Sequence, residues 1–160
     1  MNVTSATAEP IAAAEFASRI EVVRRGIERA GLAALIAFGD CWRGANISYF
    51  TEFRPLDGVS DIANAVFLLG IDSDPVLLVS DQCLDYARSV THFDVRSLRE
   101  LTDTIRKLAR RGGTAGLAGS AYVPATVLDR IRAGLGEAPL EPTQLLAETR
   151  PSKATRRCVG

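Results

Sequence analysis

The sequence LAALIAF at residues 32–38 is apolar at every position and is followed directly by Gly39 and Asp40. A strand with one face in water alternates apolar and polar side chains, whereas a strand buried on both faces is apolar throughout. The run therefore predicts an internal strand of a sheet that is covered on both sides. This single element already favours an α/β domain over an all-helical or one-sided sheet protein.

A helix is predicted immediately before this strand. Its apolar side chains recur at steps of four and three residues, charged side chains take the opposite face, and Gly31 ends it. The apolar positions are Phe16, Ile20, Val23, Ile27 and Ala30.

Two further strands are predicted after it, at residues 65–69 (AVFLL) and 76–79 (VLLV). The sequence between them, GIDSDP, is dense in turn-forming residues and is typical of a hairpin connection. At least one pair of strands is therefore expected to be antiparallel.

The second half of the chain continues the alternation of helices and strands. Ser97 and Glu100 have the spacing of a capping box at the start of a well-marked helix, and Pro124 and Pro142 suit the first turns of two more. The expected elements are a helix at 81–90, a strand at 93–96, a helix after Ser97, a strand at 114–117, a helix at 124–135, and a last helix from Pro142 that stops before Pro151. This order predicts a three-layer α/β/α domain with a mixed sheet of about five to six strands.

We divide the 160 residues into a frayed segment at 1–12, one domain at 13–150, and the start of a linker at 151–160. The composition is 47% hydrophobic, and 19 basic residues balance 19 acidic ones, which argues against nucleic acid as a partner. No apolar run is long enough to cross a membrane, so no membrane association is expected. Three scattered cysteines, Cys41, Cys83 and Cys158, suggest free thiols and a cytoplasmic protein.

The chain has few residues that could carry chemistry. Its single histidine, His92, and its scattered carboxylates do not form a ligand set for a metal, and no serine lies in a Gly-x-Ser-x-Gly elbow. The glycines at 112–119 do not match the dinucleotide-binding pattern Gly-x-Gly-x-x-Gly. We therefore expect no catalytic residue, no metal ligand and no cofactor in this chain.

The loop at residues 40–61 is the part most suited to binding, because it concentrates aromatic and charged side chains after a buried strand. Trp42, Arg54 and Asp57 are the candidate substrate-proximal residues. Arg54 could present its forked guanidinium to a substrate carboxylate, although a solvated arginine is the alternative. The apolar side chains at 47, 49, 50 and 53 are better explained as core residues of a short helical turn laid against the sheet.

Two stretches of the sequence point to a known family. NISYFTEF at residues 46–53 and LAETRPSK at 146–153 resemble landmarks of the amino-terminal domain of the creatinase, prolidase and aminopeptidase P family, and the order of elements is similar from Phe16 to Lys153. The matching positions in the first motif are Asn46, Ile47, Tyr49, Thr51 and Phe53. Glu52 departs from the glycine usual there. The resemblance implies a ribonuclease H-like fold of the creatinase amino-terminal type.

The resemblance also implies a role. In that family the metal ligands, two aspartates, one histidine and two glutamates, belong to a second, catalytic domain, and none of them maps here. We expect this chain to be the inactive amino-terminal domain of an M24-type metallopeptidase, an Xaa-Pro dipeptidase or aminopeptidase P, or of a creatinase-like hydrolase. It would shape the active-site entrance and contribute to homodimer contacts.

The expected partners are therefore the protein's own catalytic domain, encoded beyond Gly160, and a second subunit. The whole protein would hold a dinuclear centre of Mn, Co or Zn, unless it is creatinase-like and needs no metal. The alternative is a stand-alone α/β binding or assembly module without catalytic activity.

Overall fold

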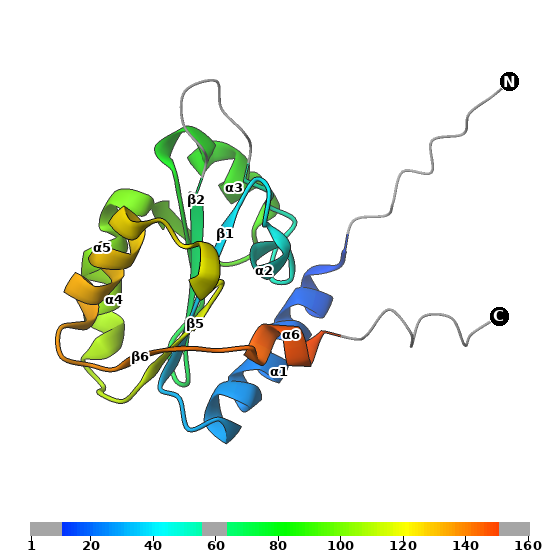
Figure 1. The fold of residues 1–160 in the computed structure, drawn as a ribbon. Coiled ribbons are helices and arrows are strands. Elements are labelled where there is room, and N and C mark those ends of the chain that lie inside the picture. The colour runs from blue at the N-terminus through cyan, green and yellow to red at the C-terminus, as the bar shows by residue number, and fades with distance from the viewer. Residues whose placement is uncertain (1–10, 56–63, 151–160) are drawn as a thin grey trace, which may run out of the picture.

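The computed structural model describes residues 11–55 and 64–150. Within them, six strands form one sheet, with helices on both faces (Figure 1). The helices are α1 (Ala13–Arg29), α2 (Ala45–Ser48), α3 (Leu84–Val90), α4 (Leu101–Ala109), α5 (Ala125–Leu135) and α6 (Leu145–Thr149). The strands are β1 (Ala34–Asp40), β2 (Asn64–Gly70), β3 (Val76–Val79), β4 (Asp94–Ser97), β5 (Ala115–Ala118) and β6 (Leu140–Pro142), and the 3₁₀ turns are η1 (Asp81–Cys83), η2 (Leu98–Glu100) and η3 (Ser120–Tyr122).

The sheet is mixed, and its strand order is β4-β3-β2-β1-β5-β6. Strand β2 runs antiparallel to both of its neighbours, β1 and β3. The turn-rich connection at 70–75 predicted this for the pair β2 and β3. The pairs β1 with β5, β3 with β4, and β5 with β6 are parallel. The predicted three-layer α/β/α architecture with a mixed sheet is therefore confirmed.

Strand β1 is buried at all seven of its residues, which confirms that the run at 32–38 belongs to an internal strand. Leu35 and Ala37 point to one face, where α1, α3 and α6 pack. Ile36 and Phe38 point to the other, which α4 and α5 cover. Figure 1 shows α4 and α5 on one side of the sheet and α1 and α6 on the other.

The end of α1 feeds directly into β1. The backbone N–H of Leu32 donates to Ile27 O over 3.0 Å, and that of Gly31 donates to Glu28 O over 3.0 Å. These two bonds make the double closure of a Schellman motif, which needs a left-handed residue, and Gly31 supplies it with a φ of 67°. The chain therefore turns sharply enough to lay α1 back across the sheet.

The last helix begins later than predicted. Pro142 does not start it but ends β6, which pairs with β5 in parallel, with Leu117 opposite Pro142. Proline is tolerated here because β6 is the outermost strand and its missing N–H would face away from the sheet. Helix α6 follows from Leu145, and Leu145 and Leu146 are buried in the core that also contains α1.

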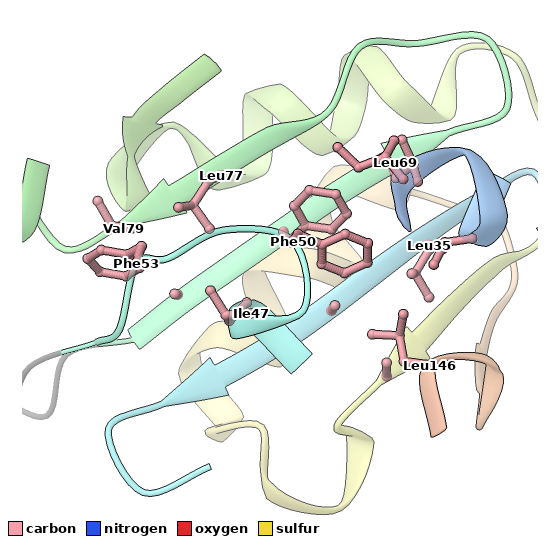
Figure 2. Close-up of a cluster of buried hydrophobic side chains, with 14 of the residues drawn as sticks. Leu35, Ile47, Phe50, Phe53, Leu69, Leu77, Val79 and Leu146 are labelled. Carbon is pink, nitrogen blue, oxygen red and sulfur yellow. The ribbon is translucent and has the colours of Figure 1, made fainter. Parts of the chain in front are cut away.

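The motif at residues 46–53 forms part of the core on the α1 face. Ile47, Phe50 and Phe53 are completely buried, and the ring of Phe50 stacks on that of Phe67 in β2 with 3.8 Å between centroids. Figure 2 shows Ile47, Phe50 and Phe53 lying over strands β1 to β3, among Leu35, Leu69 and Leu77. The interpretation of these side chains as core residues is confirmed.

The predicted division into a frayed segment, a domain and a linker stays a prediction. Residues 1–10 of the expected frayed segment and the whole expected linker at 151–160 lie outside the described residues. Helix α1 begins at Ala13 and α6 ends at Thr149, which is compatible with a domain at 13–150.

Candidate functional site

The parallel strands β1 and β5 end at the same edge of the sheet, and a group of polar side chains gathers there. We call this group the β1–β5 edge cluster. In open α/β sheets the carboxyl ends of parallel strands are the usual place for binding residues. The cluster consists of Asp40, Arg43, Asn46, Tyr122 and Arg150.

Asp40 ends β1 and organises the loop that follows. Its carboxylate accepts hydrogen bonds from the backbone N–H groups of Trp42, at 3.0 Å, and Arg43, at 2.7 Å. The guanidinium of Arg43 adds a salt bridge of 2.7 Å to the second carboxylate oxygen. Burial alone would raise the pKa of Asp40, but the hydrogen bonds from Arg43 and Trp42, with the positive charge of Arg43, outweigh it, and the pKa is lowered.

The same guanidinium also contacts an aromatic ring. Its central carbon lies 4.6 Å from the centroid of the Tyr122 ring, a cation–π distance, while about half of the side chain of Arg43 is exposed. Arg43 therefore joins the end of β1 to the turn η3 after β5.

Asn46 is the central residue of the cluster. Its Nδ2 donates to Phe38 O over 3.2 Å and to the Tyr122 hydroxyl over 3.1 Å, and its Oδ1 accepts from Arg150 Nη2 over 2.6 Å. This first residue of the NISYFTEF motif thus connects the start of α2, the end of β1 and the end of the domain.

Gly119 allows this close packing. Its φ of 87° is left-handed, and a Cβ there would lie only 3.1 Å from Phe38 O and 3.2 Å from Asn46 Nδ2. Glycine avoids both the backbone strain and the clash. Residue 119 therefore has a structural reason to lack a side chain, which the glycine-rich sequence at 112–119 did not reveal.

Thr51, another motif position, is buried and fully hydrogen-bonded. Its Oγ1 accepts from Phe53 N over 3.1 Å, and it lies 3.3 Å from Val90 O and 2.8 Å from Thr91 Oγ1. The hydroxyl therefore ties the loop to the end of α3. Glu52, the position that departs from the family pattern, accepts a hydrogen bond of 2.6 Å from Ile11 N ahead of α1.

The predicted substrate-proximal residues are only partly described. Trp42 is 74% exposed directly beside the edge cluster, and Arg54 is exposed at the far end of the same loop. A Cβ on Gly44 would lie 3.8 Å from Pro55 Cδ, so Pro55 lies close to the start of the loop. Asp57 lies outside the described residues. Within the described part of the chain, no hydrogen bond or ring contact joins the side chains of Trp42 and Arg54, and their contact with a substrate stays a prediction.

The described residues offer no place for a metal ion. Within residues 11–55 and 64–150, no group of three or more histidine, cysteine, aspartate or glutamate side chains converges. His92 is exposed beside Phe16 of α1, with 6.4 Å between ring centroids. The dinuclear centre that the resemblance implies belongs to a second domain, and it stays a prediction.

The sequence reasoning found only part of the edge cluster. It identified the loop but not Tyr122 or Arg150, which come from elements far along the chain. A local signal for Asp40 was present: an aspartate directly after a strand commonly accepts from the backbone N–H groups two and three residues on.

Comparison with known proteins identifies the family of this chain. The family model described as the Creatinase/Prolidase N-terminal domain matches residues 19–150. The chain belongs to this family. The resemblance expected from the two motifs is thereby confirmed. No curated protein gives a significant match in sequence.

Solved structures of similar fold include several peptidases and a prolidase. The chain resembles the aminopeptidase P from Streptococcus thermophilus with a TM-score of 0.65 and 23% identity, covering 85% of this chain and 98% of that one. It resembles the N-terminal domain of the cytoplasmic peptidase PepQ from Mycobacterium tuberculosis H37Rv with a TM-score of 0.62 and 19% identity, covering 83% of this chain and 98% of that one. It resembles the prolidase from Pyrococcus horikoshii OT3 with a TM-score of 0.64 and 11% identity, covering 87% of this chain and 37% of that one. At these identities the likeness shows the fold.

Among the described residues, no helix has the length and apolar character that a bilayer span requires.

Proposed function

We propose that this creatinase/prolidase N-terminal domain is the non-catalytic part of a metal-dependent hydrolase of the Xaa-Pro peptidase, aminopeptidase P or creatinase-like kind. In this role it shapes the active-site entrance and supplies contacts for a homodimer. The observation that carries the proposal is the family match over residues 19–150.

The likeness to the Pyrococcus prolidase supports a second domain. The chain spans 37% of the length of that prolidase, so most of a protein with that organisation lies outside the matched part. We propose that a catalytic domain with a dinuclear Mn, Co or Zn centre occupies the corresponding place in this protein, or a metal-free domain if it is creatinase-like. The PepQ domain of similar fold is described as cytoplasmic, and we propose the same compartment here.

The loop beside the edge cluster is the surface best suited to the entrance. Asp40 and Arg43 hold its first turn rigid, and Trp42 stands 74% exposed on that turn. A large aromatic side chain held on a fixed backbone costs little conformational entropy when it becomes a contact. We propose that Trp42 and Arg54, with Asp57 three residues further along the chain, face the catalytic domain's substrate.

Activity measurements test whether the chemistry belongs to another domain. The chain ending at Gly160 should hydrolyse neither an Xaa-Pro dipeptide nor creatine when Mn, Co or Zn is supplied. Turnover that survives repurification would overturn the assignment of the chemistry to another domain.

The entrance role is tested in the longer protein that contains this domain. Trp42→Ala and Arg54→Gln should raise KM for an Xaa-Pro dipeptide several-fold with kcat almost unchanged, because they remove binding without touching the reacting atoms. Arg132→Gln, an exposed arginine on α5, is the control and should leave both constants alone. If Trp42→Ala and Arg54→Gln behave like this control, the loop is not part of the entrance.

The alternative is a stand-alone binding or assembly module. The chain covers 98% of the PepQ N-terminal domain structure, so domains of this size exist as separate folded molecules. A natural gene that encodes no further domain after Gly160 would favour this alternative.

A further inference from the structure

A cavity of about 420 Å³ opens between α4 and the hairpin that joins β2 to β3. It lies on the face that α4 and α5 cover, the side on which Figure 1 shows these two helices together. Beyond α4, strand β4 presents Arg96 on this face instead of an apolar side chain, because Val95 points into the opposite core. The two helices therefore leave the β3–β4 side of the sheet partly uncovered, and the cavity is the result.

The cavity is separate from the β1–β5 edge cluster. Its wall includes Ala33, which precedes β1, whereas the cluster begins at Asp40, where β1 ends. A strand of this length spans roughly 20 Å at about 3.3 Å per residue. The two regions thus lie at opposite ends of the sheet.

The floor of the cavity is apolar. Leu68 is buried, and Val76 and Leu108 are partly buried members of the same hydrophobic cluster. Small-molecule sites typically combine such a floor with a few polar groups and have volumes of roughly 300–1,000 Å³. The floor suits an aliphatic or other apolar side chain.

One flank of the cavity is cationic. Lys107 and Arg111 come from the end of α4, and Arg96 comes from β4. Arg96 is paired with Asp94 at 2.7 Å and Arg111 with Asp72 at 3.0 Å. Lys107 has no hydrogen bond or ion pair to any other residue of the described ranges, so its ammonium is available for an anion.

The opposite flank, formed by the hairpin, is acidic. Asp72 is occupied by Arg111, and Asp74 has no partner within residues 11–55 and 64–150. Ser73 lies between them, and its Oγ accepts from Gly70 N over 3.0 Å, which leaves its own hydroxyl proton for donation. An unpaired cation and an unpaired carboxylate thus stand on opposite flanks of one apolar cavity.

We propose that this cavity binds a zwitterionic ligand with an apolar side chain, an amino acid or dipeptide, whose carboxylate pairs with Lys107 and whose ammonium pairs with Asp74. The inference depends on the charges and the floor of the cavity, and it holds whether or not the chain works with a catalytic domain. The free amino acid and the dipeptide share the same end groups and differ only in the separation of their charges.

Calorimetric titration of the 160-residue chain tests the ligand class. L-leucine and L-leucyl-L-leucine are the probes; L-leucinamide, which lacks the carboxylate, and N-acetyl-L-leucine, which lacks the ammonium, are the matched analogues. We expect one-to-one binding of at least one zwitterion, with its single-charge analogues at least about tenfold weaker, a ratio that corresponds to 1.4 kcal/mol. No binding of either zwitterion at about 10 mM, or equal binding of N-acetyl-L-leucine, overturns the proposal.

Substitutions locate the site. Lys107→Gln and Asp74→Asn are surface changes that keep the size of each side chain, and each should weaken binding of the zwitterion at least about tenfold. Arg110→Gln on the same helix and Asp85→Asn on α3 remove the same charges from residues that do not line the cavity, and they should leave the affinity unchanged. Equal affinity for all four variants would place the ligand elsewhere and overturn the assignment. Circular dichroism confirms that each variant is folded.

Discussion

Arg150 Nη2 donates a hydrogen bond of 2.6 Å to Asn46 Oδ1, across 104 residues of sequence. Asn46 opens the motif at residues 46–53, and Arg150 is the last described residue before the expected linker. The bond therefore holds Arg150 against the loop that carries Trp42. The side-chain amide of Asn46 thus connects the motif at residues 46–53 with Arg150, a residue of the motif at 146–153.

This relationship predicts energetic coupling between the two residues. Arg150→Ala should lower the free energy of unfolding by about 1 kcal/mol, since hydrogen bonds to charged groups contribute more than neutral ones but this pair is only partly buried. Asn46→Ala should cost more, because it also removes the bonds to Phe38 O and the Tyr122 hydroxyl.

The double variant measures the coupling. Denaturant unfolding of the wild type, the two single variants and the double variant should give an interaction energy of about 0.5–1 kcal/mol. Arg132→Ala, an exposed arginine on α5, serves as the control and should be additive with Asn46→Ala. Strict additivity of Asn46→Ala with Arg150→Ala would mean that the hydrogen bond contributes nothing to stability.

Asp40 predicts a pH dependence of stability. Because its pKa is lowered from the ordinary value of 3.8, its ionised form stabilises the fold above that pH, and this contribution is lost as the pH falls through the folded-state pKa. Asp40→Asn should therefore destabilise the domain by about 1–2 kcal/mol at pH 7 through weaker bonding to Arg43. The difference from the wild type should shrink below about pH 4.

Urea titrations at several pH values between 7 and 3 give the comparison for Asp40. Asp85→Asn, which neutralises an exposed carboxylate on α3, should track the wild type throughout. If the difference in unfolding free energy between the wild type and Asp40→Asn stays constant with pH, the ionised carboxylate does not stabilise the fold as proposed.

Two substitutions of Thr51 separate the contribution of its buried hydroxyl to stability from that of its methyl group. Thr51→Val keeps the shape but leaves Phe53 N without its acceptor, which should cost about 1–3 kcal/mol. Thr51→Ser keeps the hydroxyl and loses one methyl group, worth about 1 kcal/mol. Thermal or denaturant unfolding should rank serine above valine in stability, and the reverse order would show that packing of the methyl group dominates.

The fold was predictable because most of its helices and strands have sequence patterns that can be recognised from neighbouring residues. The apolar run at 32–38, the helical spacing from Phe16 to Ala30 and the turn at 70–75 each need only neighbouring residues to be recognised. Strand β6 was missed because it has three residues and contains Pro142, so no period can develop. Its place in the sheet depends instead on its pairing with β5, which is a tertiary effect.

The edge cluster was harder to predict because its partners are distant in sequence. Asn46 meets Tyr122 across 76 residues and Arg150 across 104, and no pattern within a window of a dozen residues records such pairs. The motif drew attention to Asn46 without giving its partners. Arginine side chains are especially difficult, since the same residue type is exposed at Arg54 and hydrogen-bonded at Arg150.

At Gly134, between α4 and α5, we predict that even the methyl side chain of alanine is too large. A Cβ there would lie 2.7 Å from the backbone Thr102 O and 2.8 Å from Ile105 Cβ, so the helices themselves would have to move apart. Alanine favours a helix over glycine by about 1 kcal/mol, but overpacking costs about 1–3 kcal/mol. Gly134→Ala should therefore be destabilised by about 1 kcal/mol in denaturant unfolding.

Gly26 in α1 provides the matched control for this last prediction. A Cβ at Gly26 would also meet an atom at 2.7 Å, but that atom is Leu145 Cδ1, the end of a side chain that can rotate away. Gly26→Ala gains the same helix propensity with less strain, so it should be close to neutral. If both variants gained stability, the two helix pairs would be loosely packed, whereas a loss at Gly134 alone would show that backbone contact sets the spacing of α4 and α5.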